Sequence, residues 1–223
     1  MTLQLMDRRP VFRAATLVRA AASVPFATAL IALLLATTVW TRLHAGETDS
    51  ILDWASTNVH NLSVAPIRSI VLSAAFLPGG RWVAEASLLA TVLVPLERRF
   101  GSRLSLAVFG SAHILATLLT EGWIWFGIRS GAIPGSAGYQ QDVGVSYGMY
   151  GVAGAVLFLL PVRYRLAAAA LLASYLLGQF AQSPDMTTTG HLLSLAIGLA
   201  WWPLLGRRLR CSVPSAARNL AAS

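Results

Sequence analysis

The 223-residue sequence has no lysine, only one cysteine and only 12% charged residues. A soluble domain carries roughly 25% charged residues, so this inventory cannot cover a surface that faces water. The lone cysteine, Cys211, excludes a disulfide within the chain, and we expect it to be inert because metal and thiol chemistry usually recruits partners. With 56% hydrophobic residues, the sequence predicts an integral membrane protein.

Long uncharged stretches predict six spanning helices. At about 20 apolar residues per span, the length allows roughly six spans and leaves no room for a separate soluble domain. The expected spans are 20–43, 82–96, 104–128, 145–161, 166–180 and 191–205. The stretch 67–77 is apolar but short, which predicts an interfacial or re-entrant element. The first stretch is too long for the apolar part of a typical signal peptide.

The basic residues, all 17 of them arginines, predict the orientation, because cytoplasmic loops are enriched in arginine. Most lie in alternate segments: Arg8, Arg9, Arg13, Arg19, Arg98, Arg99, Arg103, Arg163, Arg165, Arg207, Arg208, Arg210 and Arg218. The opposite segments carry Glu47, Asp49, Asp53, Asp142 and Asp185, with only Arg42, Arg68, Arg81 and Arg129. We therefore expect an all-α membrane protein with both termini in the cytoplasm.

This topology divides the chain into three parts. We expect a cytoplasmic N-terminal segment at 1–19, a six-helix membrane domain at 20–206 and a cytoplasmic tail at 207–223. Since topology accounts for the arginines, we expect contacts with anionic membrane lipids and no binding of nucleic acid. Arginine without lysine suggests a GC-rich genome, and the charge pattern suits the plasma membrane of a bacterium.

Ionisable or nucleophilic residues inside a span are costly and usually functional. The candidates are Glu85, His113, Ser146 and His191. We expect His113, in the middle of the third span, to form an interhelical hydrogen bond. Ser146 and His191 both lie near the outer ends of their spans, so they can meet, and an imidazole that takes the serine proton creates a nucleophile. Asp185 is expected in a solvated outer loop, outside this pair.

Several motifs resemble those of one family. Residues 144–155 read GVSYGMYGVAGA and are similar to the active-site motif of the rhomboid intramembrane serine proteases, G-A-S-G-A-x-F-G-x-x-G-A. His191 with Gly198 resembles the family's pattern A-H-x-x-G-x-x-x-G in the last helix. Residues 96–101, LERRFG, resemble its L-E-x-x-F-G signature, and residues 76–80, FLPGG, resemble the segment before the second span. The resemblance covers roughly residues 67–205.

The resemblance implies a six-helix rhomboid-like bundle in which Ser146 is the nucleophile and His191 the general base. It further implies that Tyr150 packs beneath the histidine ring and that Gly198 lets the last helix sit close to the serine helix. Gly144 opens the motif, and backbone amides near Ser146, with Arg81 as a further donor, would hold the oxyanion. No metal or cofactor is implied. The expected partners are transmembrane protein substrates or clients.

Three residues depart from the family pattern. Tyr147 stands where the family usually has glycine, and its bulk alters the oxyanion site or the cavity mouth. Arg81 and Glu85 stand where the proteases place a histidine and an asparagine as oxyanion donors. An ionised glutamate repels an oxyanion, and losing such a donor costs about two to three powers of ten in rate. Glu85 can instead pair with Arg81 one turn away, which we favour, or stay protonated.

Two functions follow from these observations. The first is an intramembrane serine protease that cleaves transmembrane or membrane-adjacent segments near the outer leaflet. The alternative is a rhomboid-like pseudoprotease that binds transmembrane helices without cutting them; the altered second span favours it, whereas the retained serine and histidine oppose it. A channel or transporter is less supported, because the sequence lacks paired discontinuous helices and a line of ionisable residues.

Overall fold

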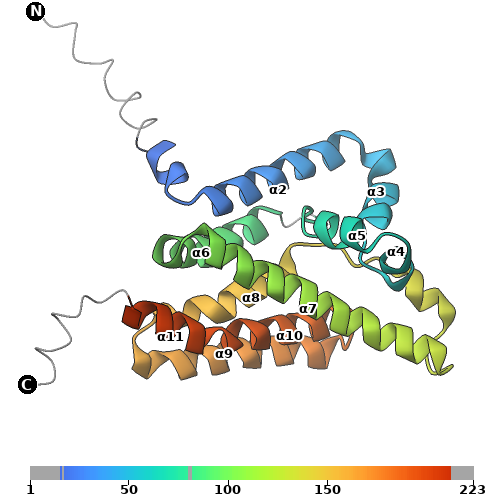
Figure 1. Ribbon diagram of the computed structural model, residues 1–223. Helices are drawn as coiled ribbons and strands as arrows, with labels where there is room; N and C mark the ends of the chain where they lie inside the picture. Colours follow the sequence, from blue (N-terminus) through green and yellow to red (C-terminus); the bar gives the residue numbers. More distant parts are fainter. Residues whose placement is uncertain (1–15, 17, 80–81, 212–223) are drawn as a thin grey trace, which may run out of the picture.

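The computed structural model describes residue 16, residues 18–79 and residues 82–211, and this part of the chain is helical without a strand. The longer helices in Figure 1 are α2 (Pro25–Leu43), α6 (Trp82–Phe100), α7 (Ser102–Arg129), α8 (Ser146–Val156), α9 (Val162–Gln182), α10 (Met186–Ala200) and α11 (Trp202–Cys211). The short elements are η1 (Ala45–Glu47), α3 (Thr48–Ala55), α4 (Val59–Val64), α5 (Pro66–Ser73), η2 (Gly135–Tyr139) and η3 (Leu157–Leu159).

Three stretches of the described chain are long and apolar enough to cross a membrane. They are Pro25–Leu43, Ser102–Arg129 and Met186–Arg210, which joins α10 to α11. They match the predicted spans 20–43, 104–128 and 191–205. The other predicted spans also form helices, namely α6, α8 with η3, and α9. Of these, α8 with η3 is a shorter apolar helix. The described part of the chain is therefore all-helical, and three of its stretches are able to cross a membrane.

Helix boundaries differ from the predicted ones where capping or a connection intervenes. The residues between the first predicted span and the short apolar stretch at 67–77 fold into η1, α3 and α4, and most of the short apolar stretch lies in the short helix α5. The last helix begins at Met186, before the predicted 191, because Asp185 caps it. Helix α11 continues to Cys211, into the segment predicted as a tail.

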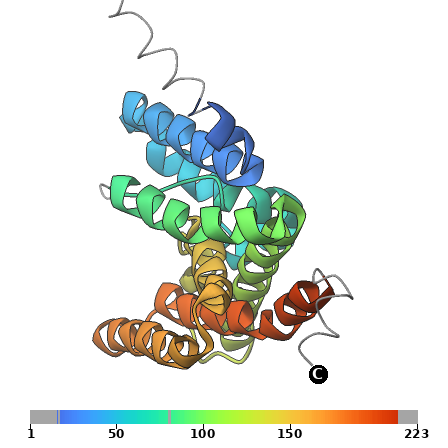
Figure 2. The ribbon, with the colours of Figure 1, turned by 90° about the vertical axis from the view of Figure 1, so that its left-hand side faces the viewer.

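Helix α8 lies at the centre of the molecule. It contacts α6, α7 and α10, and Figure 2 shows it between α2 and α6 on one side and α9 and α10 on the other. Eight of its eleven residues are buried, and Val152 and Ala155 join the hydrophobic core. The residue that begins this central helix is Ser146.

A buried carboxylate attaches α2 to the other helices. Glu97 of α6 is only 2% exposed. Its oxygens accept hydrogen bonds from the backbone N–H groups of Phe26 (2.8 Å) and Ala27 (2.7 Å), in the first turn of α2. The hydroxyl of Ser102 also donates to it (2.6 Å). Because a negative charge stabilises the positive end of a helix, the glutamate of the LERRFG motif caps α2 from another helix.

Candidate active site

The backbone before α8 sets the position of Ser146. Gly144 has φ +148°, a conformation that side chains with a Cβ rarely adopt. Its N–H donates to the carbonyl of Ser73 (2.9 Å), which ties this turn to α5. Two residues later, Ser146 occupies the first position of α8. A glycine at 144 therefore allows the sharp turn that brings the serine to the end of the central helix.

The loop before Gly144 is fixed by the segment between α3 and α4. The N–H of Asp142 donates to the hydroxyl of Ser56 (2.8 Å). The carbonyl of Asp142 accepts from both the N–H (2.9 Å) and the hydroxyl (3.0 Å) of Thr57. All three residues are buried. The short helices that the sequence did not predict thus hold the approach to Ser146.

His191 lies in the second turn of α10, and the start of that helix is capped. The Asp185 side chain accepts from the N–H of Thr188 (2.8 Å), and the Thr188 hydroxyl accepts from the N–H of Asp185 (3.2 Å). Partial burial raises the pKa of Asp185, but hydrogen bonds from Thr188 and Ser183 and the nearby His191 outweigh it and hold the pKa below its ordinary value. The exposed Asp185 therefore acts as a charged cap.

Helices α8 and α10 approach so closely that only glycine fits at their crossing. A Cβ on Gly198 would collide with the backbone carbonyl of Gly151, and a Cβ on Gly154 would approach the carbonyl of Leu195 to 2.7 Å. Small residues allow this close approach of helices in membranes. This contact at Gly151, Gly154 and Gly198, which we call the glycine seam, fixes α10, and therefore His191, relative to α8 and Ser146.

Ser146 and His191 line one cavity of about 470 Å³. Tyr150, one turn after the serine, also lines it, and the centroids of its ring and the His191 ring are 4.4 Å apart. The remaining lining residues are Pro78, Ala84, Glu85, Leu88, Gln141, Val143, Gly144, Val145, Met149, Tyr175, Gln179 and Thr187. The structure thus brings together the serine, the histidine and the tyrosine that the motifs single out.

The two ring nitrogens of His191 have no hydrogen-bond partner among the described residues, and both are shielded from solvent. The ring is held by aromatic contacts instead, with Tyr150 and, edge to face at 5.9 Å, with Tyr147. A nitrogen without a partner is available to accept a proton from a hydroxyl that approaches it. Hydrogen bonds of this kind are often long in the free enzyme and tighten only when substrate binds.

The residues that depart from the family pattern have different surroundings. Tyr147 is 3% exposed, and its ring packs where a Cβ of Gly190 would otherwise lie. Glu85 lines the cavity and interacts with another residue. Arg81 lies outside the described residues, and so does its predicted pairing with Glu85. The cavity therefore contains a carboxylate on the helix from which an oxyanion donor was expected.

His113 forms the interhelical hydrogen bonds that were predicted for it. Its Nε2 lies 3.1 Å from the hydroxyl of Ser73 and 3.0 Å from the carbonyl of Ile70, both on α5. The prediction of a structural histidine at this position is confirmed.

Two buried carboxylates beside the site were not found by motif. Glu121 of α7 is 2% exposed, and neither of its oxygens has a hydrogen-bond partner among the described side chains and backbone groups. Asp142 is 8% exposed. Burial raises the pKa of its carboxyl group, hydrogen bonds from Thr57 and Tyr147 lower it, and the net result is a pKa of about 6. Asp142 also interacts electrostatically with Glu121. An acidic residue inside the predicted span 104–128 was the available signal for Glu121. Asp142 had none, because its burial depends on the fold of α3 and α4.

Within residues 18–79 and 82–211, no group of three or more histidine, cysteine, aspartate or glutamate side chains is arranged to hold a metal ion.

These features define a helical membrane protein in which a serine and a histidine from two closely packed helices face one cavity. The family model described as "Rhomboid-like protein" matches residues 17–211 of this chain. The chain therefore belongs to the family of rhomboid-like proteins, and the resemblance inferred from its motifs is confirmed. Neither the curated proteins nor the solved structures yielded a match.

Proposed function

We propose that this protein is a rhomboid-like intramembrane serine protease that cleaves transmembrane or membrane-adjacent segments of other proteins. The observation that carries the proposal is the single cavity lined by Ser146, His191 and Tyr150. Membership of the rhomboid-like family supports it further. Two helices joined by a glycine seam keep the serine and the histidine at fixed relative positions, which is what a catalytic pair requires.

The chemistry is acyl transfer. The Ser146 hydroxyl oxygen attacks the carbonyl carbon of the substrate peptide bond while His191 takes the hydroxyl proton. When the tetrahedral intermediate collapses, the C–N bond breaks, and His191 returns the proton to the leaving amine. Water then hydrolyses the acyl-serine ester by the same route. Backbone N–H groups at the start of α8 are the donors that stabilise the oxyanion.

The proposed topology has six spans with both termini in the cytoplasm. In addition to the three apolar stretches, α6, α8 with η3, and α9 complete the six. With this orientation the cavity opens toward the outer leaflet of a bacterial plasma membrane. The membrane protein substrates would enter it there.

The second candidate is a pseudoprotease that binds transmembrane helices without cutting them. The observation that favours it is Glu85, which lines the cavity on α6, because an ionised carboxylate near the oxyanion would raise the barrier to attack. The pseudoprotease hypothesis predicts that client helices bind and that no peptide bond is broken, whereas the protease hypothesis predicts cleavage.

The test is a cleavage assay in proteoliposomes. The purified full-length protein is reconstituted with a set of tagged single-span reporter proteins whose transmembrane segments carry glycine or proline, and Ser146→Ala and His191→Ala variants are compared with the wild type. The protease proposal predicts reporter fragments that appear with the wild type and are lost in both variants. Reporters that co-purify with the wild type without being cut would overturn it in favour of the pseudoprotease.

A further inference from the structure

Tyr147 follows the proposed nucleophile directly in the sequence, yet its side chain does not line the cavity. Ser146 and Tyr150, four residues apart on α8, line the cavity together with His191. Successive residues of a helix point about 100° apart, and Tyr147 faces inward, where it is only 3% exposed. Its ring contacts His113 of α7 and His191 of α10. The tyrosine is therefore an interior residue that joins three helices.

The contact with His191 is well defined. The rings of Tyr147 and His191 meet edge to face, with 5.9 Å between their centroids and 82° between their planes. Tyr150 contacts the same imidazole at 4.4 Å and 47°. Residues three apart are neighbours on the surface of a helix, so the imidazole contacts two adjacent side chains of the helix that carries the serine.

The fit of Tyr147 against α10 depends on a glycine beside the histidine. A Cβ on Gly190 would collide with the ring carbons of Tyr147 and come within 2.5 Å of its hydroxyl oxygen. The ring therefore lies against the backbone of α10, one residue before His191. Its position is tied to the part of the backbone that carries the imidazole.

Polar groups hold the hydroxyl end of the Tyr147 ring. The hydroxyl lies between two acceptors, the carbonyl of Met186 (3.4 Å) and the carboxyl group of Asp142. That carboxyl group also accepts from the hydroxyl of Thr57 (3.1 Å). Tyr147 thus connects the loop before α8 to the first turn of α10.

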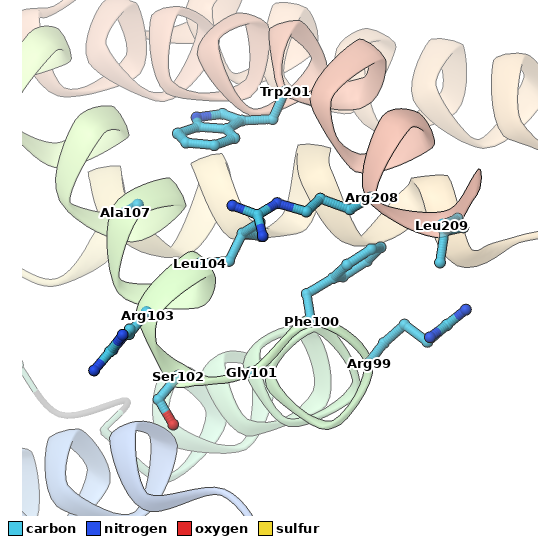
Figure 3. Close-up of a pocket in the computed structure, with 10 residues that line it drawn as sticks. All are labelled: Arg99, Phe100, Gly101, Ser102, Arg103, Leu104, Ala107, Trp201, Arg208 and Leu209. Carbon is cyan, nitrogen blue, oxygen red and sulfur yellow. The ribbon is translucent and has the colours of Figure 1, made fainter. Parts of the chain in front are cut away.

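The rest of α10 is fixed by separate contacts. The glycine seam holds its middle against α8. At its other end, the Trp201 indole extends toward α7 (Figure 3), and its N–H donates to the hydroxyl of Ser111 (3.0 Å). Removing the Tyr147 ring should therefore release the His191 ring and leave the helix in place.

A histidine that acts as a general base needs a fixed orientation, which a hydrogen bond from a third residue usually supplies. In the part of the chain that the structure describes, neither ring nitrogen of His191 has such a partner. The orientation of the imidazole therefore depends on its aromatic contacts, and Tyr147 provides the one that is anchored to polar groups.

We propose that Tyr147 is a positioning residue for His191. Its ring, held at the hydroxyl end, keeps the imidazole in the orientation in which it can accept the proton of Ser146. The inference rests on the proposed protease function and deepens it. It gives a structural reason for the tyrosine that stands where the rhomboid motif usually has glycine.

The first test measures the mobility of the histidine rings and needs no activity. Full-length protein with ¹³C-labelled histidine is studied by NMR relaxation in detergent micelles, and His191→Gln identifies the signal of His191 among the four histidines. In Tyr147→Leu the order parameter of the His191 ring should fall from a rigid value of about 0.85 toward about 0.6. Tyr147→Phe, which keeps the ring, should preserve it, and the exposed His60 is the internal control.

The second test measures how fast a fluorophosphonate probe modifies Ser146. A misplaced catalytic group costs about 10²-fold in rate, and we expect that loss in Tyr147→Leu. Tyr147→Phe loses only the hydroxyl contact and should react about threefold more slowly than the wild type. Tyr164→Leu, at an exposed tyrosine of α9, is the matched control and should react like the wild type.

The two tests separate a failure of this inference from a failure of the proposed function. An unchanged order parameter for His191 in Tyr147→Leu would overturn the inference, whatever the rate of modification. A mobile ring in that variant, beside a folded wild type that takes up no probe, would support the contact and overturn the protease. If Tyr147→Leu fails to fold, Tyr147→Met carries both tests, because methionine fills irregular space with a flexible chain.

Discussion

Helices α8 and α9 follow each other in the chain and are both apolar, yet their surroundings differ. In α8, eight of eleven residues are buried, whereas α9, with 21 residues, buries only Ala169 and Leu176. Leu166, Leu171 and Leu177 of α9 are all more than half exposed on the protein surface. In a membrane, apolar side chains do not need burial in protein, so hydrophobicity alone does not reveal which helix is central.

What separates the two helices is how closely their glycines are packed. The glycines of α8 at 148, 151 and 154 each face a neighbour so closely that a Cβ would meet Phe109, Ala112 or Leu195. On α9, Gly178 has nothing within 4 Å of the position of a Cβ. Close packing at glycines therefore surrounds the helix that carries Ser146, and it is absent at Gly178 of α9.

The largest effect should come from filling the seam between α8 and α10. In Gly198→Leu the new side chain would occupy the position of the Gly151 backbone, and we expect a loss of about 4 kcal/mol or more in the free energy of unfolding. Thermal unfolding in detergent micelles measures it. Gly178→Leu on α9 is the matched control and should unfold close to the wild type; similar losses in both variants would mean that the seam is not special.

A smaller loss is expected from releasing α2, another peripheral helix. Glu97→Ala removes the carboxylate that accepts from Phe26 and Ala27 and leaves two backbone N–H groups without their partners. We expect a cost of roughly 3 kcal/mol in unfolding free energy and faster proteolysis between α2 and α6. Glu47→Ala, in the exposed η1, should change neither quantity. Wild-type stability in Glu97→Ala would show that α2 is held by its apolar face alone.

The loop that leads to α8 should make stability depend on pH. The pKa of Asp142 rises from 3.8 to about 6 on folding, so between these values the folded chain holds a proton that the unfolded chain has lost. The contribution of Asp142 to stability is therefore greatest below about pH 4 and falls by on the order of 3 kcal/mol as the pH rises through 6.

Unfolding of the wild type and of Asp142→Asn, followed from pH 4 to pH 7, isolates this contribution. The variant should lose that part of the pH dependence, whereas Asp49→Asn, an exposed acid at the same end, should keep it. Parallel curves for wild type and Asp142→Asn would contradict the burial of a destabilised carboxylate at this position.

The smallest effect should have the opposite sign. Gly178→Ala adds a Cβ where the helix has open space, and alanine is favoured over glycine within a helix by roughly 0.5–1 kcal/mol. We expect a slight rise in the unfolding temperature, whereas Gly198→Ala should lower it. The two alanine variants thus compare the exposed helix with the seam at the level of one methyl group.

The sequence predicted the helices and the candidate site to different extents. Long uncharged stretches with flanking arginines located the helices, because the bilayer constrains them, and motif spacing singled out Ser146, His191, Tyr150 and Gly198. It did not predict α3 and α4, which are only eight and six residues long. The start of α10 was placed five residues late, although the D-x-x-T pattern at Asp185 and Thr188 is the signal of a capping box.

Other features depend on tertiary structure and have no local signal. Glu97 caps a helix that lies 70 residues earlier in the chain, and the motif that contains it does not indicate this role. Asp142 and Thr57 are 85 residues apart, and their contact follows from the way α3 and α4 fold over the loop. A pattern of hydrophobicity cannot encode such pairings, because they are made between polar groups from separate elements.

The account rests on an activated Ser146, and the most direct measurement of it needs no substrate. The purified protein in detergent is treated with a fluorophosphonate probe, and the modified residue is identified by peptide mass spectrometry in the wild type, Ser146→Ala, His191→Ala and the exposed-serine control Ser130→Ala. The account predicts an adduct on Ser146 that persists in Ser130→Ala and is lost in the other two variants. A folded wild type that takes up no probe at Ser146 would contradict it.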